Sequence, residues 1–391
     1  MTMIMKSNKE NKKAVYLKKY AKATAVFLAV SFLVSGCAAD KGAGGTADVS
    51  QSASESASAE IPDSADSVHT LLEISDPDER AAVEAAKAKV AAMDSEPRII
   101  ATSPATAQIC DALELDLVGI CSSSLSSLPE RYSKATQVGT SMAPDMEIVS
   151  SLNPDWVLSP ASLQTDLQPK YEAIDTDWAF LNLRSVPGMY RSIQELGDIF
   201  GRQEQAQLLV GEFTEFYREY KTRNEGKDAP KVLVLMGLPG SYIIATENSY
   251  VGSLVELAGG ENVYAGTDQE FLTVNTEDMK TKEPDVILCA AHALPDQVIE
   301  MFREDFETND IWKHFEAVQN GRIYYLSYEL FGMSASFSYP EALEELQPML
   351  YPESAADEEA ARESSGNAEK EALSSEASEN IDEDVLGAIA R

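Results

Sequence analysis

MEIVSSLNPDWVLS, at residues 146–159, has a counterpart farther along the chain in TEDMKTKEPDVILCA, at residues 276–290. In each stretch a glutamate, Glu147 or Glu277, stands seven residues before a Pro-Asp pair that opens a β-rich run. The order of helix, turn and strand is therefore the same in both halves of the chain. An internal repeat of this kind predicts two equivalent α/β lobes.

Around each repeat, short β-rich runs alternate with helical ones. Apolar strands separated by helices are typical of a parallel sheet with helices on both faces. We therefore predict an N-terminal lobe at residues 96–184 and a C-terminal lobe at residues 229–352. The runs that predict further strands are RIIAT (98–102), LVGIC (117–121), AFLNL (179–183), KVLVLMG (231–237), SYIIA (241–245) and RIYYLS (322–327).

Residues 185–228, between the lobes, have a helical pattern without strand-like runs. Their apolar side chains recur at helical spacing, and Gly197 and Gly201 weaken the middle, where a kink is expected. The predicted fold class is therefore α/β, with two Rossmann-like lobes joined by a single long helix. A ligand cleft between the lobes follows, because ligands of parallel sheets bind at the carboxyl ends of the strands.

The N-terminus predicts export. Seven lysines precede the apolar run 23–34, and LVSGC at residues 33–37 places small residues before Cys37. A charged segment, a short apolar run and small residues before a cut are the marks of a signal peptide, here residues 1–36. The run is shorter than the roughly 20 residues that span a bilayer. The segment resembles a bacterial lipobox, so we predict a lipid anchor on Cys37 at the outer face of the cytoplasmic membrane.

The flanks of the predicted lobes are acidic and poor in large apolar residues. Residues 37–75 predict a disordered acidic tether, and residues 76–95 an Ala-rich and Glu-rich lead-in helix. Residues 353–391 hold twelve acids against three basic residues and predict a disordered acidic tail. These flanks leave room for a further contact with a cell-wall or surface partner.

Composition and motifs exclude several functions. The formal charge of −34 argues against nucleic acid, since phosphate binding needs concentrated Lys and Arg. There is no GxSxG, Walker A or HExxH motif, so we predict no enzyme. Cys110, Cys121 and Cys289 are too few and too scattered for a disulfide framework, and we expect them to be buried.

Two residues stand where the predicted cleft opens. His292 follows the strand DVILCA, and it either contacts a bound ligand or is a capped loop histidine. Met142 lies in a loop of small residues just before a helix, which is an unusual place for a core methionine. Met146, on the helix, is expected to pack in the core. His314, on a predicted amphipathic helix, favours packing or surface exposure, and His69 lies at the edge of the tether.

The body of the chain, from residue 97 to residue 352, resembles the class III ABC substrate-binding proteins, which have a helical backbone between their lobes. Within this class it is most similar to the haem-receptor lipoproteins of iron-regulated surface determinant systems. The stretches that carry the resemblance are GTSMAPDMEIV (139–149), VLVLMGLPGSYIIATENSYVGSLVELAGGENV (232–263), PDVILCAAHALP (284–295) and NDIWKHFEAVQN (309–320).

The resemblance implies one haem between the lobes, with Met142 and His292 as the axial ligands of its iron. A thioether and an imidazole fill both axial positions, which favours carriage over oxygen chemistry. It also implies that Glu147 and Glu277 dock into arginine pockets of an ABC permease. The haem propionates need donors, and the helix N-terminus at Ser103 is a candidate anion site. Upstream cell-wall haem-transfer proteins are further expected partners.

Other functions remain open on sequence alone. A receptor for an iron-siderophore or cobalamin would share the fold, although the loops at the predicted cleft offer few Arg or Lys. A secreted enzyme that degrades haem would turn it over in the presence of a reductant. An adhesion or scaffolding lipoprotein would show no spectral change on addition of hemin.

Overall fold

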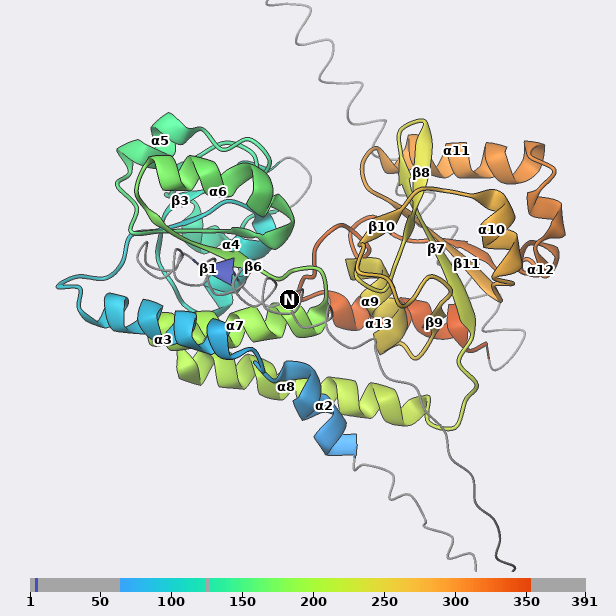
Figure 1. Cartoon of the computed structure of the whole chain (residues 1–391), viewed down its shortest axis with the longest axis horizontal. Coiled ribbons are helices and arrows are strands. Elements are labelled where there is room, and N and C mark those ends of the chain that lie inside the picture. Colours follow the sequence, from blue (N-terminus) through green and yellow to red (C-terminus); the bar gives the residue numbers. More distant parts are fainter. Residues whose placement is uncertain (1–3, 6–63, 124–126, 353–391) are drawn as a thin grey trace, which may run out of the picture. The chain divides into compact units, whose positions relative to one another are not determined.

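The computed structural model describes residues 4–5, 64–123 and 127–352 (Figure 1). Cys37, the predicted acidic tail, most of the predicted signal peptide and most of the predicted tether lie outside the described residues. Among the helices described, none is long and apolar enough to cross a membrane.

The first lobe is built on a sheet with the strand order β1-β6-β5-β2-β3-β4. All neighbouring strands are parallel except β1, which pairs antiparallel with β6. The carboxyl ends of β2 to β6 therefore meet at one edge of the sheet. The strands are β1 (Ile4–Met5), β2 (Ile99–Ala101), β3 (Leu117–Ile120), β4 (Thr136–Gln137), β5 (Trp156–Pro160) and β6 (Asp177–Leu181), and the helices between them are α4 (Pro104–Ala112), α5 (Met146–Ser151) and α6 (Gln164–Ala173).

Strand β1 lies within the residues predicted as the signal peptide, and it pairs with the sheet of the first lobe. Ile4 pairs with Phe180 and Met5 with Ala179 on the outer edge of β6. An edge strand offers unpaired amides and carbonyls to any segment that can align with them, which is the physical reason for this short pairing.

The second lobe has the strand order β10-β8-β7-β11-β12, with β9 also paired to β7. SYIIA was expected in a parallel sheet, but it forms β8, which is antiparallel to β7. The reason is the connection: only Pro239 and Gly240 separate the strands, far too few residues for a parallel crossover. The strands are β7 (Lys231–Leu238), β8 (Ser241–Ala245), β9 (Glu261–Asn262), β10 (Phe271–Leu272), β11 (Val286–Ala291) and β12 (Ile323–Tyr325), and the helices are α9 (Tyr250–Leu257), α10 (Thr276–Thr281), α11 (Pro295–Thr308), α12 (Glu316–Gln319) and α13 (Tyr339–Leu350).

The predicted single long helix is two helices, α7 (Val186–Phe200) and α8 (Gln203–Arg223). Gly201 caps α7 in the left-handed conformation, with φ of 66°, and so ends the helix instead of kinking it. The chain then turns back, so that the ring of Tyr190 on α7 stacks on that of Phe213 on α8, with the ring centroids 4.6 Å apart. The connection between the lobes is therefore a helical hairpin, and α8 carries the chain to the second lobe.

The last part of the predicted tether is also helical. Helix α2 (Ser64–Leu72) buries Val68 and Leu72, and two side chains of α7 hold its C-terminal carbonyls. Arg191 Nη1 donates to Leu71 O at 2.5 Å, and Gln194 Nε2 donates to Leu72 O at 3.1 Å. Burial of these two apolar side chains and the two hydrogen bonds fix the end of the segment, which explains why it is not part of a disordered tether. Helix α3 (Pro77–Ala91), capped by Asp76, lies within the range predicted for the lead-in helix.

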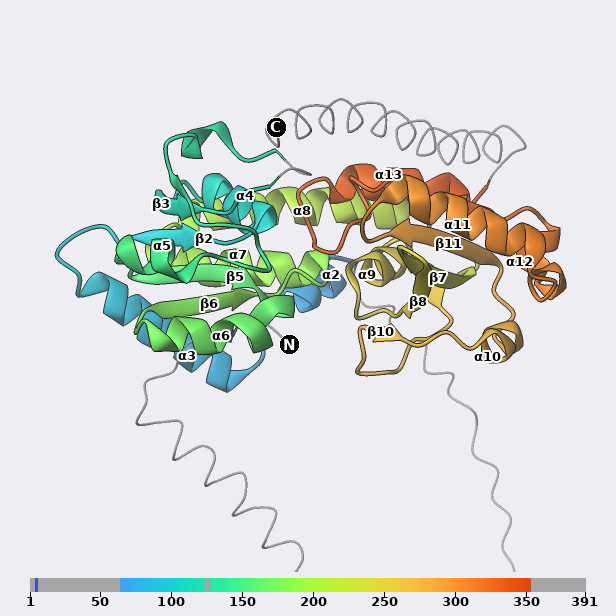
Figure 2. The same ribbon diagram turned by 90° about the horizontal axis from the view of Figure 1, so that it is seen from above.

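The joint between the lobes is a contact of α8 with α13. Tyr220 Oη donates to Leu343 O at 2.9 Å, and Asn224 and Gln347 exchange side-chain hydrogen bonds of 3.0 and 2.7 Å. Arg223 forms a two-point ion pair with Glu344. Figure 2 shows α8 running along α13, as these contacts require.

Candidate functional site

The loop that carries Met142 is tightly closed at its base. Asp145 N donates to Val138 O at 2.7 Å, and Gly139 and Pro144 form an isolated β-bridge. The four residues enclosed by both pairs, 140–143, form the tip of the loop, and Met142 there is 72% exposed, the highest value among the exposed large apolar residues described. Met146, on α5, packs against the core, as predicted.

Glu147 and Glu277 occupy equivalent places in the two lobes. Each is the second residue of a six-residue helix, α5 or α10, and each side chain is exposed. The helices start at equivalent caps: the side chain of Asp145 accepts from Glu147 N at 3.0 Å, and that of Asn275 accepts from Asp278 N at 3.2 Å.

The turns after these two helices match as well. Asp155 Oδ2 accepts from Arg98 N at 2.8 Å, and Asp285 Oδ2 accepts from Lys231 N at 2.7 Å. The residue before each Pro-Asp pair has a positive φ, 46° at Asn153 and 49° at Glu283. The repeat seen in the sequence is thus a repeat of backbone structure, and it gives the two glutamates the same local setting.

His292 follows β11 at the carboxyl edge of the second sheet. Its backbone N donates to Gly237 O at 2.9 Å, which fixes the residue to the end of the neighbouring strand β7. The side chain is partly buried, and its Nδ1 atom is buried without a hydrogen-bond partner among the described residues. Two residues on, Leu294 is 45% exposed and in the left-handed region, with φ of 48°.

Ser103 is the N-cap of α4, where the sequence predicted a helix start. Its Oγ accepts from Thr106 N at 3.1 Å and lies 2.8 Å from Thr106 Oγ1, and the side chain is buried. The hydroxyl therefore serves the helix itself. An anion at this end of α4 remains a prediction, and it would rely on backbone amides.

The remaining candidates have no chemistry of their own. Cys110, Cys121 and Cys289 are buried and free, as predicted, and burial raises the pKa of the first two thiols to about 12 and about 11 and that of Cys289 well above its usual range. His314 ends a short 3-10 turn, not the predicted amphipathic helix, and is exposed. In the described parts of the chain, no group of three His, Cys, Asp or Glu side chains could hold a metal ion.

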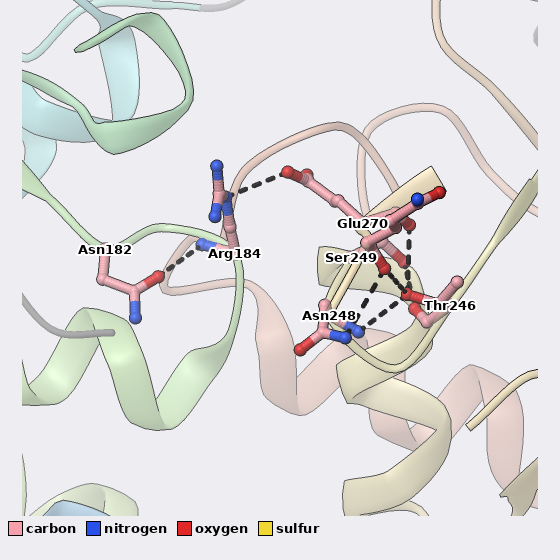
Figure 3. Close-up of polar contacts among 7 residues, drawn as sticks. Asn182, Arg184, Thr246, Asn248, Ser249 and Glu270 are labelled. Carbon is pink, nitrogen blue, oxygen red and sulfur yellow. Dashed lines mark hydrogen bonds and ion pairs between the residues drawn. The ribbon is translucent and has the colours of Figure 1, made fainter. Parts of the chain in front are cut away.

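One feature of the site is not predicted by the sequence: an ion pair between the lobes. Arg184, just after β6, places Nε 2.9 Å from Oε2 of Glu270, just before β10 (Figure 3). Burial raises the pKa of Glu270, and the guanidinium of Arg184 partly offsets this rise. A signal was present in the sequence, since Arg184 follows the end of a predicted strand, but nothing there identified its partner.

Comparison with known proteins identifies the family to which this architecture belongs. The family model described as periplasmic binding protein matches residues 99–330. This chain belongs to that family. The match begins at β2 and runs past β12, so it takes in both lobes and the hairpin between them. The predicted family and the two-lobed α/β class are confirmed.

Relatives of known structure span the same region. An ABC transporter substrate-binding protein from Listeria monocytogenes EGD-e is 47% identical, with a TM-score of 0.63 over 66% of this chain and 99% of its own. IsdE of Staphylococcus aureus, solved in complex with heme, is 38% identical, with a TM-score of 0.62 over 66% of this chain and 100% of its own.

A curated relative agrees with these structures. The high-affinity heme uptake system protein IsdE of Staphylococcus aureus strain Newman is 39% identical over 259 residues, which cover 65% of this chain and 87% of the relative. These relatives are binding proteins of transport systems. The flanks of this chain, with the predicted tether and tail, account for most of what lies outside the matched region.

Proposed function

We propose that this protein is the lipid-anchored receptor of an ABC importer, and that its cargo is haem. The observation that carries the proposal is the exposed thioether of Met142, held out by a closed loop at the carboxyl edge of the first sheet. The similarity to a heme uptake protein over 87% of that protein's length supports the same cargo.

The exposure of Met142 is the physical reason to expect an apolar ligand. A fully buried methionine side chain stabilises a protein by about 1.5–3 kcal/mol relative to an exposed one, so the loop forgoes this gain in the free protein. Leu294, two residues after His292, is exposed as well. Both proposed ligand loops therefore present apolar surface, which a porphyrin would cover.

His292 would supply the second axial ligand. Its backbone is fixed by the hydrogen bond to Gly237, so that the imidazole starts from a defined position. Nδ1 is buried, which leaves Nε2 as the nitrogen to coordinate iron. With sulfur and nitrogen on opposite faces, the iron would have no open position, and the protein would bind and release haem without chemically converting it.

Hemin titration followed by absorbance tests the proposal. Met142→Leu and His292→Ala are each expected to shift the Soret band and to weaken hemin binding by at least about tenfold, since even outer-shell changes at metal sites cost that much. Met146→Leu and His314→Ala are the matched controls, and both should behave as wild type. Wild-type spectra and affinity in both ligand variants would refute the assignment.

The rest of the proposed function concerns location and partners. Lipidation of Cys37 would hold the receptor at the outer face of the cytoplasmic membrane, because two or more acyl chains give stable anchoring. Glu147 and Glu277 would dock on the permease, one from each lobe. Cell-wall haem-transfer proteins would supply the cargo.

A further inference from the structure

The ion pair of Arg184 with Glu270 joins the two lobes beside the carboxyl edge of the first sheet. Arg184 lies between the end of β6 and the start of α7, and its side chain is 40% exposed. Glu270 belongs to the second lobe, and its side chain is 17% exposed. The cation therefore faces solvent while the anion is mostly covered.

Both partners are mounted on fixed backbone (Figure 3). Arg184 N donates to the Asn182 side chain at 3.3 Å, and Asn182 N donates to Ser192 Oγ at 3.0 Å. On the other lobe, Thr246 N donates to Glu270 O at 3.1 Å. Neither residue sits on a loose loop, so the guanidinium is held at a defined place.

Most of the hydrogen-bonding capacity of Arg184 is unused. The contact with Glu270 is an ion pair without a hydrogen bond, since Nε–H donates to no acceptor in the described part of the chain. The two Nη atoms likewise have no partner among the residues described. A guanidinium presents five N–H donors in a planar fork that matches a carboxylate with two parallel bonds. That fork is available here.

Arg184 is also the one Lys or Arg in the described segments that follow the strands of the two lobes. The segments that follow the carboxyl ends of the strands contain no other Lys or Arg. Uncompensated carboxylates are costly to bring out of water, so a cargo that carries them needs such a donor. The segments are 102–103, 121–123, 127–129, 138–145, 161–163, 182–185, 239–240, 246–249, 263–270, 273–275, 292–294 and 326–338.

We propose that Arg184 binds a carboxylate of the cargo through its Nη fork, and that Glu270 is the counter-ion that keeps the guanidinium in place. The inference rests on the proposed function and deepens it: the cargo is a tetrapyrrole that must carry at least one free carboxylate. The ion pair with Glu270 is formed by Nε, so a cargo carboxylate bound by the two Nη atoms does not have to displace it. Arg184 then bridges the second lobe and the bound cargo.

The test compares hemin with hemin dimethyl ester, whose two carboxylates are blocked. Arg184→Gln is expected to weaken hemin binding by about tenfold, the loss of a charge-assisted pair, and to leave binding of the ester within about twofold of wild type. Glu270→Gln should keep hemin binding within about threefold, because the Nη fork remains. Arg131→Gln, which removes an exposed Arg paired with Asp116 on the same lobe, is the control and should affect neither ligand.

Two results would overturn the inference. One is hemin affinity of Arg184→Gln equal to that of wild type. The other is an equal loss for hemin and for the ester in both Arg184→Gln and Glu270→Gln, which would mean that the pair acts only by holding the lobes together. Failure of the proposed function is a separate outcome, since wild-type protein would then bind neither ligand and Met142→Leu would change nothing.

Discussion

The position of His292 depends on a residue that has no side chain. Gly237, at the end of β7, accepts the His292 amide through its carbonyl, and helix α11 packs directly over it. A Cβ atom at this position would collide with Val298 and would lie 2.7 Å from the Phe302 ring, both on α11. The close approach of α11 to β7 therefore requires glycine, and α11 begins three residues after His292.

Gly237→Ala is expected to damage both stability and binding. Inserting a methyl group into a packed core costs about 1–3 kcal/mol, so the free energy of unfolding in urea should fall by about that amount. Because the displaced helix carries the His292 segment with it, hemin affinity should fall too. Gly332→Ala is the control: its added Cβ meets its nearest neighbour, Tyr328 O, at 3.7 Å, and it should match wild type in both measurements. A variant as stable as wild type would contradict the packing argument.

Residue-scale features differed in how far the sequence could predict them. The loop place of Met142 and the edge place of His292 follow from strand ends, which a sequence marks well. The sequence does not show whether the Ser103 hydroxyl caps the helix or binds an anion, because both roles use the same residue type. The Arg184 and Glu270 pair could not be predicted, because it depends on how one lobe meets the other.

At the scale of elements, the hydrophobic pattern predicts many of the helices and strands correctly, but it does not predict how some of them connect. The helical periodicity of residues 185–228 is real, but a period does not show whether a glycine bends a helix or ends it. The tertiary contact of Tyr190 with Phe213 decides this point. The sequence predicts residues 64–72 as tether because few of them are apolar, yet α7 supplies hydrogen-bond donors to the carbonyls of Leu71 and Leu72, and Val68 and Leu72 join the apolar core.

Gly201 and Gly211 should respond in opposite ways to replacement by alanine. Neither would bring its Cβ within 4 Å of another atom, so packing plays no part. Gly201 has a φ of 66°, which alanine adopts with strain, and Gly201→Ala should lower the free energy of unfolding by about 1–2 kcal/mol. Gly211 lies inside α8, where alanine is favoured, and Gly211→Ala should raise it by about 0.5–1 kcal/mol. Urea denaturation measures both, and a stabilised Gly201→Ala would mean that α7 and α8 can join into one helix.

At the scale of the whole molecule, the contacts of α8 with α13 favour a receptor whose lobes move little. The joint combines edge-to-face contacts of Phe213 and Phe216 on α8 with Tyr339 on α13, a hydrogen bond from the Tyr220 hydroxyl to a backbone carbonyl, and the two-point ion pair of Arg223 with Glu344. Aromatic pairs add about 0.5–1.5 kcal/mol each beyond the area they bury. Opening the lobes would have to break several of these contacts together. The two proposed docking glutamates would therefore keep a fixed separation.

A fixed separation makes docking a two-point contact, and this predicts how Glu147 and Glu277 behave. Glu147→Lys and Glu277→Lys should each reduce haem uptake by cells, or hemin-stimulated ATPase activity of the reconstituted importer, by about tenfold or more, because reversing a charge opposite arginine replaces attraction by repulsion. The double variant should be little worse than either single one, since a receptor held at one point is already wrongly oriented over the permease.

Hemin affinity in solution should not change in any of these three variants, because both side chains are exposed on their own short helices. Glu84→Lys, an exposed acid on α3, is the control and should support normal uptake. Normal uptake by the double variant would remove these residues from the docking surface and leave the haem site unaffected.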